Sequence, residues 1–133
     1  MFAYETVIRL SHTDAAGVIF FARLFDLLHL AYESFLEGIG QPLPDDLAGS
    51  AIVIPIAHAS ADYRRPLRLN DRIAIEVSVE NIGTRSFTLT YRVRRGGSLA
   101  AEARTVHVAI ARSDGRPRAL PDELARALAS TSK

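Results

Sequence analysis

The sequence of 133 residues contains no cysteine, no tryptophan and a single methionine. Without cysteine there is no disulfide and no thiolate ligand for a metal. A strong charge of one sign is also lacking, since 16 basic and 15 acidic side chains leave a formal net charge of +1. That balance gives no reason to expect a nucleic acid or an anionic membrane as a partner. The four histidines lack the spacing of metal-binding motifs, so we expect no metal site.

Long apolar runs are missing as well. No stretch approaches the roughly 20 residues that cross a bilayer. The first nine residues alternate and include Glu5, which is unlike a signal peptide. We therefore expect a cytoplasmic protein without a membrane partner. The length suits one domain over residues 1–133, with a frayed end at residues 130–133.

What the sequence does contain is a change of hydrophobic period. Alternation over residues 2–10 predicts a strand, and apolar residues three and four apart over residues 20–37 predict a helix. Further strands are predicted at residues 51–64, 73–80, 85–94 and 99–112, with a hairpin turn at Gly96-Gly97 and a short helix from Pro121.

These elements indicate an α+β fold. Consecutive strands with short links form an antiparallel sheet. The first helix is apolar on most sides, so a curved sheet of about five strands is expected to wrap round it. Such a sheet leaves an open edge and part of the helix bare. We therefore expect a homo-oligomer, either a dimer or a dimer of dimers.

Chemistry is most strongly suggested between the first strand and the helix, in the segment with Asp14 and Gly17. The free N–H groups at a helix start attract anions and can hold a developing oxyanion. A structural explanation is also available, since an aspartate before a helix commonly caps it and a glycine commonly serves a tight turn. Spacing alone leaves both explanations open.

Residues 13–21, Thr-Asp-Ala-Ala-Gly-Val-Ile-Phe-Phe, resemble the Asp-x-x-Gly-hydrophobic-x-aromatic signature of the 4-hydroxybenzoyl-CoA thioesterase family, which has the hotdog fold. The resemblance continues through residues 61–66, 70–73 and 85–87, and covers roughly residues 4–123. Residues 12–18, 29–33 and 54–60 are most similar to the 1,4-dihydroxy-2-naphthoyl-CoA thioesterases of phylloquinone and menaquinone synthesis. Leu30 departs from the more polar residue expected there.

The resemblance implies that Asp14 is the catalytic carboxylate, acting as nucleophile or as general base on water. It also implies that the Gly17 turn and the backbone N–H at or near Phe21 polarise the thioester carbonyl. The substrate would be a small-molecule acyl-CoA, so coenzyme A is part of the substrate and no separate cofactor is expected. A pocket containing Phe20, Phe25 and Tyr63 would suit an aromatic acyl group.

Two further groups of residues are candidates for substrate contact. His58 and Ser60 share strand parity with Ile54 and Ile56, so they would line the helix-side cavity if those isoleucines face the helix. A buried core histidine is the other reading of His58. The family's need for a CoA phosphate contact is met by the candidates Arg64, Arg65 and Arg85, and a solvated strand face is the alternative for each arginine.

Three alternatives to the naphthoyl substrate remain at this point. The protein could act on 4-hydroxybenzoyl-CoA, or on short-chain acyl groups carried by CoA or by an acyl-carrier protein. It could also be a hotdog module that binds acyl-CoA without hydrolysing it. Replacing Asp14 with alanine separates the last alternative from the enzymes, because a binding module has no turnover to lose.

Overall fold

The computed structural model describes residues 2–131. The elements follow in the order β1 (Phe2–Val7), the 3-10 turn η1 (Leu10–His12), α1 (Arg23–Gly38), the 3-10 turn η2 (Leu47–Gly49), β2 (Ile52–Val53), β3 (Ile56–Tyr63), β4 (Arg72–Ile82), β5 (Ser86–Arg95), β6 (Ser98–Val108), β7 (Ile110–Ala111) and α2 (Asp122–Thr131). Ser130 thus lies in α2, and residues 132–133 of the expected frayed end fall outside the described residues.

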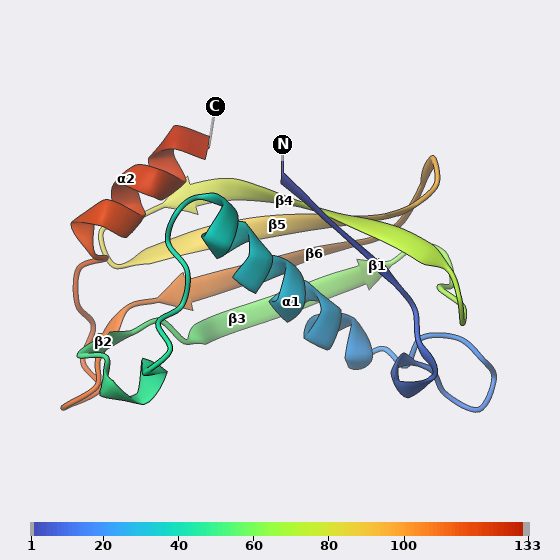
Figure 1. The fold of residues 1–133 in the computed structure, drawn as a ribbon, viewed down its shortest axis with the longest axis horizontal. Coiled ribbons are helices and arrows are strands. Elements are labelled where there is room, and N and C mark those ends of the chain that lie inside the picture. The colour runs from blue at the N-terminus through green and yellow to red at the C-terminus, as the bar shows by residue number, and fades with distance from the viewer. Residues whose placement is uncertain (1, 132–133) are drawn as a thin grey trace.

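Five strands form one antiparallel sheet in the order β1-β4-β5-β6-β3, and β2 pairs with β7 in a small second sheet. The sheet curves round α1, which crosses one face of it (Figure 1). The α+β prediction of a curved five-stranded antiparallel sheet wrapped round one apolar helix is therefore confirmed. The Gly96-Gly97 turn between β5 and β6 is confirmed too, with Gly96 at a φ of 60°.

The core lies between α1 and the concave face of the sheet. Its buried helix residues occur at the spacing that the sequence shows, at Leu24, Leu27, Leu28, Ala31, Tyr32, Phe35 and Leu36. They pack against the inward side chains of β4 and β5, including Ile75, Leu89 and Val93. Truncating one such leucine to alanine typically costs about 2–5 kcal/mol. This packing fixes the position of the helix relative to the strands that surround the candidate site.

The helix begins three residues later than the hydrophobic period predicts. Phe20 donates its N–H to the carbonyl of His12 at 2.9 Å, and Ile19 donates to the carbonyl of Leu67 at 2.7 Å. Because these loop contacts hold the chain just before α1, Phe20 and Phe21 lie in a turn and the first helical residue is Arg23. The first strand is also shorter than predicted, since the chain enters η1 at Leu10.

The predicted strand at residues 51–64 is divided in two. Pro55, which has no N–H to donate to a ladder, separates β2 from β3. A bulge follows at once, because Ile56 pairs with His107 while His58 pairs with the adjacent Val106. The extra residue reverses the parity of the strand, so Ile56 and His58 lie on opposite faces. The strand at residues 99–112 is likewise divided between Val108 and Ile110.

Candidate functional site

Asp14 lies in a tight turn that its own backbone and side chain close. Its N–H donates to the carbonyl of Val18 at 2.9 Å, and its carbonyl accepts from the N–H of Gly17 at 3.0 Å. One carboxylate oxygen, Oδ1, accepts from the N–H of Ala16 at 2.9 Å. Gly17 has a φ of 79°, a left-handed conformation that glycine adopts without the clash of a side chain. The predicted turn at Gly17 is therefore present.

The Asp14 turn is attached to the loop between β3 and β4. Ile19 donates to the carbonyl of Leu67, and Leu69 donates to the carbonyl of Gly17 at 3.1 Å. Val18 and Arg68 form an antiparallel bridge between these contacts. The exposed carboxylate of Asp14 is therefore carried by a backbone that is hydrogen-bonded on both sides.

Asp14 does not cap the helix. The N-cap of α1 is Ala22, whose side chain makes no capping bond, and the Asp14 side chain instead binds within its own turn. Asp14 is exposed, and its Oδ2 has no hydrogen-bond partner among residues 2–131. The capping explanation that the sequence left open is thus excluded, and one carboxylate oxygen is available to a ligand.

Two consecutive backbone amides lie unpaired at the start of α1. Phe20 and Arg23 donate their N–H groups to loop carbonyls, but within the described chain the N–H groups of Phe21 and Ala22 have no acceptor. They lie at the end of the helix where the macrodipole is positive. Such amides are suitable donors for a negatively charged oxygen.

Aromatic side chains surround this start of the helix. Phe21 is 63% exposed, and its ring centroid lies 4.9 Å from that of Phe20. Tyr63, from the edge strand β3, donates its hydroxyl to the carbonyl of Phe21. Burial raises the pKa of Tyr63. Phe25 is partly buried and packs against the core. The structure therefore places the predicted residues Phe20, Phe21 and Tyr63 together, with Phe25 on the helix turn that follows.

His58 and Ser60 lie on the other face of the sheet. They pair with Val106 and Arg104, whereas Tyr63 pairs with the buried Ala101 on the face toward α1. The expectation that they share a face with Ile56 is wrong, because the bulge between Ile56 and His58 inverts the strand. Both side chains are exposed, so the core-histidine reading of His58 does not hold either.

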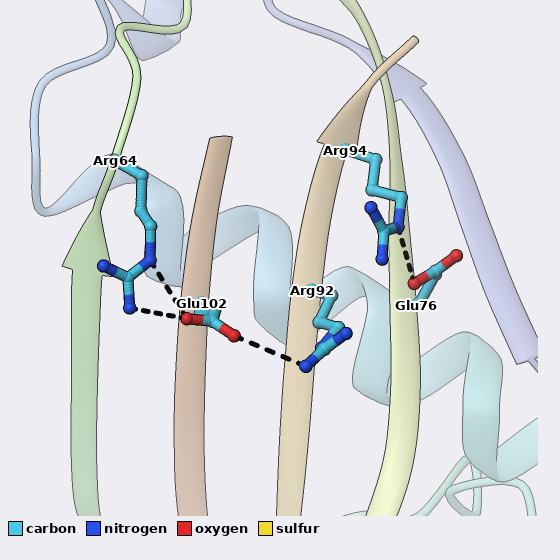
Figure 2. Close-up of polar contacts among 5 residues, drawn as sticks. All are labelled: Arg64, Glu76, Arg92, Arg94 and Glu102. Carbon is cyan, nitrogen blue, oxygen red and sulfur yellow. Dashed lines mark hydrogen bonds and ion pairs between the residues drawn. The ribbon is translucent and has the colours of Figure 1, made fainter. Parts of the chain in front are cut away.

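The three predicted arginines have different surroundings. Arg64 donates from Nε and an NH2 nitrogen to Glu102 Oε2, at 3.0 and 2.7 Å, and Arg92 approaches Oε1 of the same carboxylate at 3.7 Å. These groups lie on the sheet face that is turned away from α1 (Figure 2). The bond from Arg64 lowers the pKa of Glu102. Arg64 is therefore already paired with a carboxylate.

Arg65 and Arg85 are both exposed and have no side-chain partner among residues 2–131. Arg65 lies in the loop that pairs with the Asp14 turn, and its N–H donates to the carbonyl of Ala100 at 3.1 Å. Arg85 lies in the turn between β4 and β5, at the opposite end of the sheet strands. Of the three, Arg65 is the free cation on the Asp14 side of the chain.

A polar network under α1 was not singled out from the sequence. The hydroxyl of Tyr91 and Thr105 Oγ1 are 2.8 Å apart, and Thr105 Oγ1 lies 2.8 Å from Nε2 of His107. His107 is fully buried and stacks on Phe87 with centroids 4.6 Å apart. Burial lowers its pKa from 6.5 to about 4. The signal was its strand parity with Ala101, Ala103 and Thr105, which the structure places on the inner face.

Three other observations bear on ligand chemistry. No group of three or more potential metal ligands occurs in the described part of the chain. Across the same residues, no helix is both long and apolar enough to pass through a bilayer. A shallow depression of about 460 Å³ lies on the outer side of β1, β4 and β5, lined by residues such as Glu5, Arg72 and Arg94. None of the predicted site residues lines it.

Comparison with known proteins identifies the family. The model of the thioesterase-like superfamily matches residues 8–128. A 1,4-dihydroxy-2-naphthoyl-CoA hydrolase from Rippkaea orientalis is 42% identical, with 96% of this chain and 95% of the relative covered. The hydrolase of the same name from Nostoc punctiforme is 37% identical, with 92% and 83% covered.

A solved structure agrees with these relatives. The 1,4-dihydroxy-2-naphthoyl-CoA thioesterase from Synechocystis superposes with a TM-score of 0.90 at 29% identity, covering 99% of this chain and 98% of that one. The match therefore includes the Asp14 turn, the helix and the whole sheet. On its sequence and on its fold, the chain belongs to the thioesterase-like superfamily.

Proposed function

We propose that this protein hydrolyses an aromatic acyl-CoA thioester, with 1,4-dihydroxy-2-naphthoyl-CoA as its substrate and Asp14 as the catalytic carboxylate. The observation that carries the proposal is the Asp14 turn. Its Oδ1 is held by Ala16, while Oδ2 is free, and unpaired amides stand at Phe21 and Ala22. The names of the relatives, which match over nearly the whole chain, support the choice of substrate.

Two reaction routes fit these groups. In the first, Asp14 attacks the thioester carbonyl carbon, the carbon–sulfur bond breaks, and the CoA thiolate leaves and takes up a proton. Water then hydrolyses the resulting anhydride and regenerates the carboxylate. In the second, Asp14 removes a proton from water, which attacks the same carbon directly. In both routes the carbonyl oxygen becomes negative, and backbone N–H donors at the helix start stabilise it.

The aromatic side chains near the helix start supply an apolar surface for the acyl ring. Phe20 and Phe21 are exposed beside each other, and Tyr63 is 42% exposed on the same face of the sheet as α1. Rings of this kind bind an aromatic group by offset or edge contacts. His58 and Ser60 are left out of this pocket, because they lie on the opposite face.

The edge strand β3 supports a homodimer. Seven of its eight residues are exposed, it has no neighbour on one side among the described strands, and Ile56 and Tyr63 are large apolar side chains on it. An unprotected edge of this kind pairs readily with a second strand. We propose that β3 pairs with a second copy of this chain, which would bring further residues to the open aromatic surface. Two such dimers would give the tetramer.

For the nucleotide end of the substrate, Arg65 is the phosphate contact that we propose. It is unpaired and belongs to the loop that is hydrogen-bonded to the Asp14 turn. Arg64 is engaged by Glu102, and Arg85 lies at the opposite end of the sheet. An arginine suits a phosphate because its guanidinium presents several N–H donors in one plane.

The test is hydrolysis of a panel of CoA thioesters, followed by detection of the free thiol. The panel contains 1,4-dihydroxy-2-naphthoyl-CoA, 4-hydroxybenzoyl-CoA and acetyl-CoA. We expect the largest kcat/KM for the naphthoyl thioester. A preference for acetyl-CoA would overturn the substrate assignment, and tight binding of the thioesters without thiol release would overturn the assignment as an enzyme.

A further inference from the structure

One hydrogen bond joins the edge of the sheet to the start of the helix. The hydroxyl of Tyr63 donates to the carbonyl of Phe21, although the two residues are 42 positions apart in the chain. Tyr63 itself is held on both sides of its position. It pairs with Ala101 in β6, and the next two residues, Arg64 and Arg65, both donate their N–H groups to the carbonyl of Ala100. Its hydroxyl is therefore presented from a fixed part of the sheet.

The carbonyl that Tyr63 holds belongs to the same peptide group as the N–H of Ala22. In a trans peptide these two groups lie in one plane and point in opposite directions, and no cis peptide occurs in the described chain. Fixing the Phe21 carbonyl therefore also fixes the direction of the Ala22 N–H, which points away from Tyr63. This N–H has no acceptor among residues 2–131.

Little else restrains this peptide. Phe21 is 63% exposed, its carbonyl has no other hydrogen bond in the described chain, and its own N–H is unpaired. The neighbours on both sides are anchored, since Phe20 donates to His12 and Arg23 donates to Phe20. The Phe21–Ala22 peptide is thus the segment before α1 whose orientation depends on a side chain from another strand.

We infer that Tyr63 is a positioning residue, which holds the Phe21–Ala22 peptide so that the Ala22 N–H remains a free, directed donor for the oxygen of the thioester carbonyl. The inference rests on the proposed function, and assigns to Tyr63 a role that acts through the backbone rather than through contact with the acyl ring. A donor that is already oriented stabilises a developing oxyanion without the cost of ordering it during the reaction.

The test compares two tyrosine-to-phenylalanine variants with the wild type, using 1,4-dihydroxy-2-naphthoyl-CoA. Tyr63→Phe keeps the ring and removes only the hydroxyl. We expect kcat to fall about 10- to 100-fold, because a misdirected group near the reacting atoms has an effect of this order. KM should stay within about twofold, since the ring remains. The melting temperature should change by no more than about 3 °C.

Tyr4→Phe is the matched control. Tyr4 lies in β1 on the same face of the sheet, is partly buried, and has a hydroxyl without a hydrogen-bond partner among residues 2–131. This variant should keep the wild-type kcat. An unchanged kcat in Tyr63→Phe, or an equal fall in both variants, overturns the inference while leaving the thioesterase assignment intact. Failure of the wild type to release thiol from any thioester overturns both.

Discussion

Asp14 and Asp46 lie in turns of the same local design, one on each side of α1. In each, Oδ1 of the aspartate accepts a backbone N–H from a residue just ahead, Ala16 at 2.9 Å and Gly49 at 3.1 Å. Both aspartates are exposed. A hydrogen-bonded aspartate turn is therefore not by itself a sign of function, and the surroundings of each turn must distinguish them.

The surroundings differ in what they leave unsatisfied. Around Asp46, Arg112 donates to the carbonyls of Ser50 and Leu47 at 2.8 and 2.9 Å, so the polar groups of that loop are paired with one another. The segment after Asp14 instead leaves two amides unpaired and two phenylalanines exposed. Groups without a partner in the folded chain are the ones that a ligand can use.

The largest expected effect comes from removing Asp14. Asp14→Ala should lower kcat by about 10³-fold, which corresponds to about 4 kcal/mol of activation free energy. The affinity for a non-hydrolysable acyl-CoA analogue should remain close to that of the wild type, because the carboxylate contributes to the reaction more than to binding. Steady-state thiol release and calorimetric binding check the two parts. Loss of affinity together with kcat would mean that the turn shapes the pocket instead.

The next effect concerns the buried polar network, where satisfaction is internal. The pKa of His107 is lowered from 6.5 to about 4 in the folded chain, so between these values the unfolded chain binds more protons. Stability therefore falls as the pH decreases from about 6.5 to about 4, by about 3 kcal/mol in total, and levels off below that. Urea unfolding at several pH values measures this slope. His107→Gln should flatten it, and an unchanged slope in that variant would assign the loss to other groups.

A smaller effect is expected at Asp46, where the comparison predicts a change in stability without a change in activity. Asp46→Ala removes the side-chain cap of η2. Losing a cap of this kind costs about 1 kcal/mol. Thermal unfolding should show the loss, and kcat should equal that of the wild type. A fall in kcat as large as that of Asp14→Ala would remove the distinction between the two turns.

The smallest effect distinguishes neighbouring arginines. Arg65→Gln should raise KM for the CoA thioester about threefold, because one exposed contact with a phosphate contributes less than about 1 kcal/mol. It should leave KM unchanged for the corresponding pantetheine thioester, which lacks the nucleotide. Arg64→Gln, at a side chain already paired with Glu102, should change neither value. A larger rise in Arg85→Gln would move the nucleotide to the other end of the sheet.

The sequence predicts the helix and the strands well because their signals are local. The apolar residues of α1 recur at helical spacing, and the strands alternate over most of their length. The start of α1 was misplaced because Phe20 and Phe21 continue the apolar pattern. Contacts from His12 and Leu67, which are distant in sequence, hold this part of the chain outside the helix.

The candidate site was predictable only in part for the same reason. Asp14 and Gly17 form a turn within a few residues, so their geometry follows from their own segment. The bulge after Ile56 left no clear pattern, and it moved His58 and Ser60 to the outer face. The pairing of Arg64 with Glu102 and of Tyr63 with Phe21 depends on which strands become neighbours, which local patterns do not specify.

The most direct test of the account is thiol release from 1,4-dihydroxy-2-naphthoyl-CoA by Asp14→Asn. The asparagine side-chain oxygen can still accept the N–H of Ala16, so the turn is kept while the negative charge is removed. The account predicts an unchanged melting temperature and a loss of nearly all hydrolysis. Hydrolysis at the wild-type rate by this folded variant would show that Asp14 only shapes the turn, and would contradict its catalytic role.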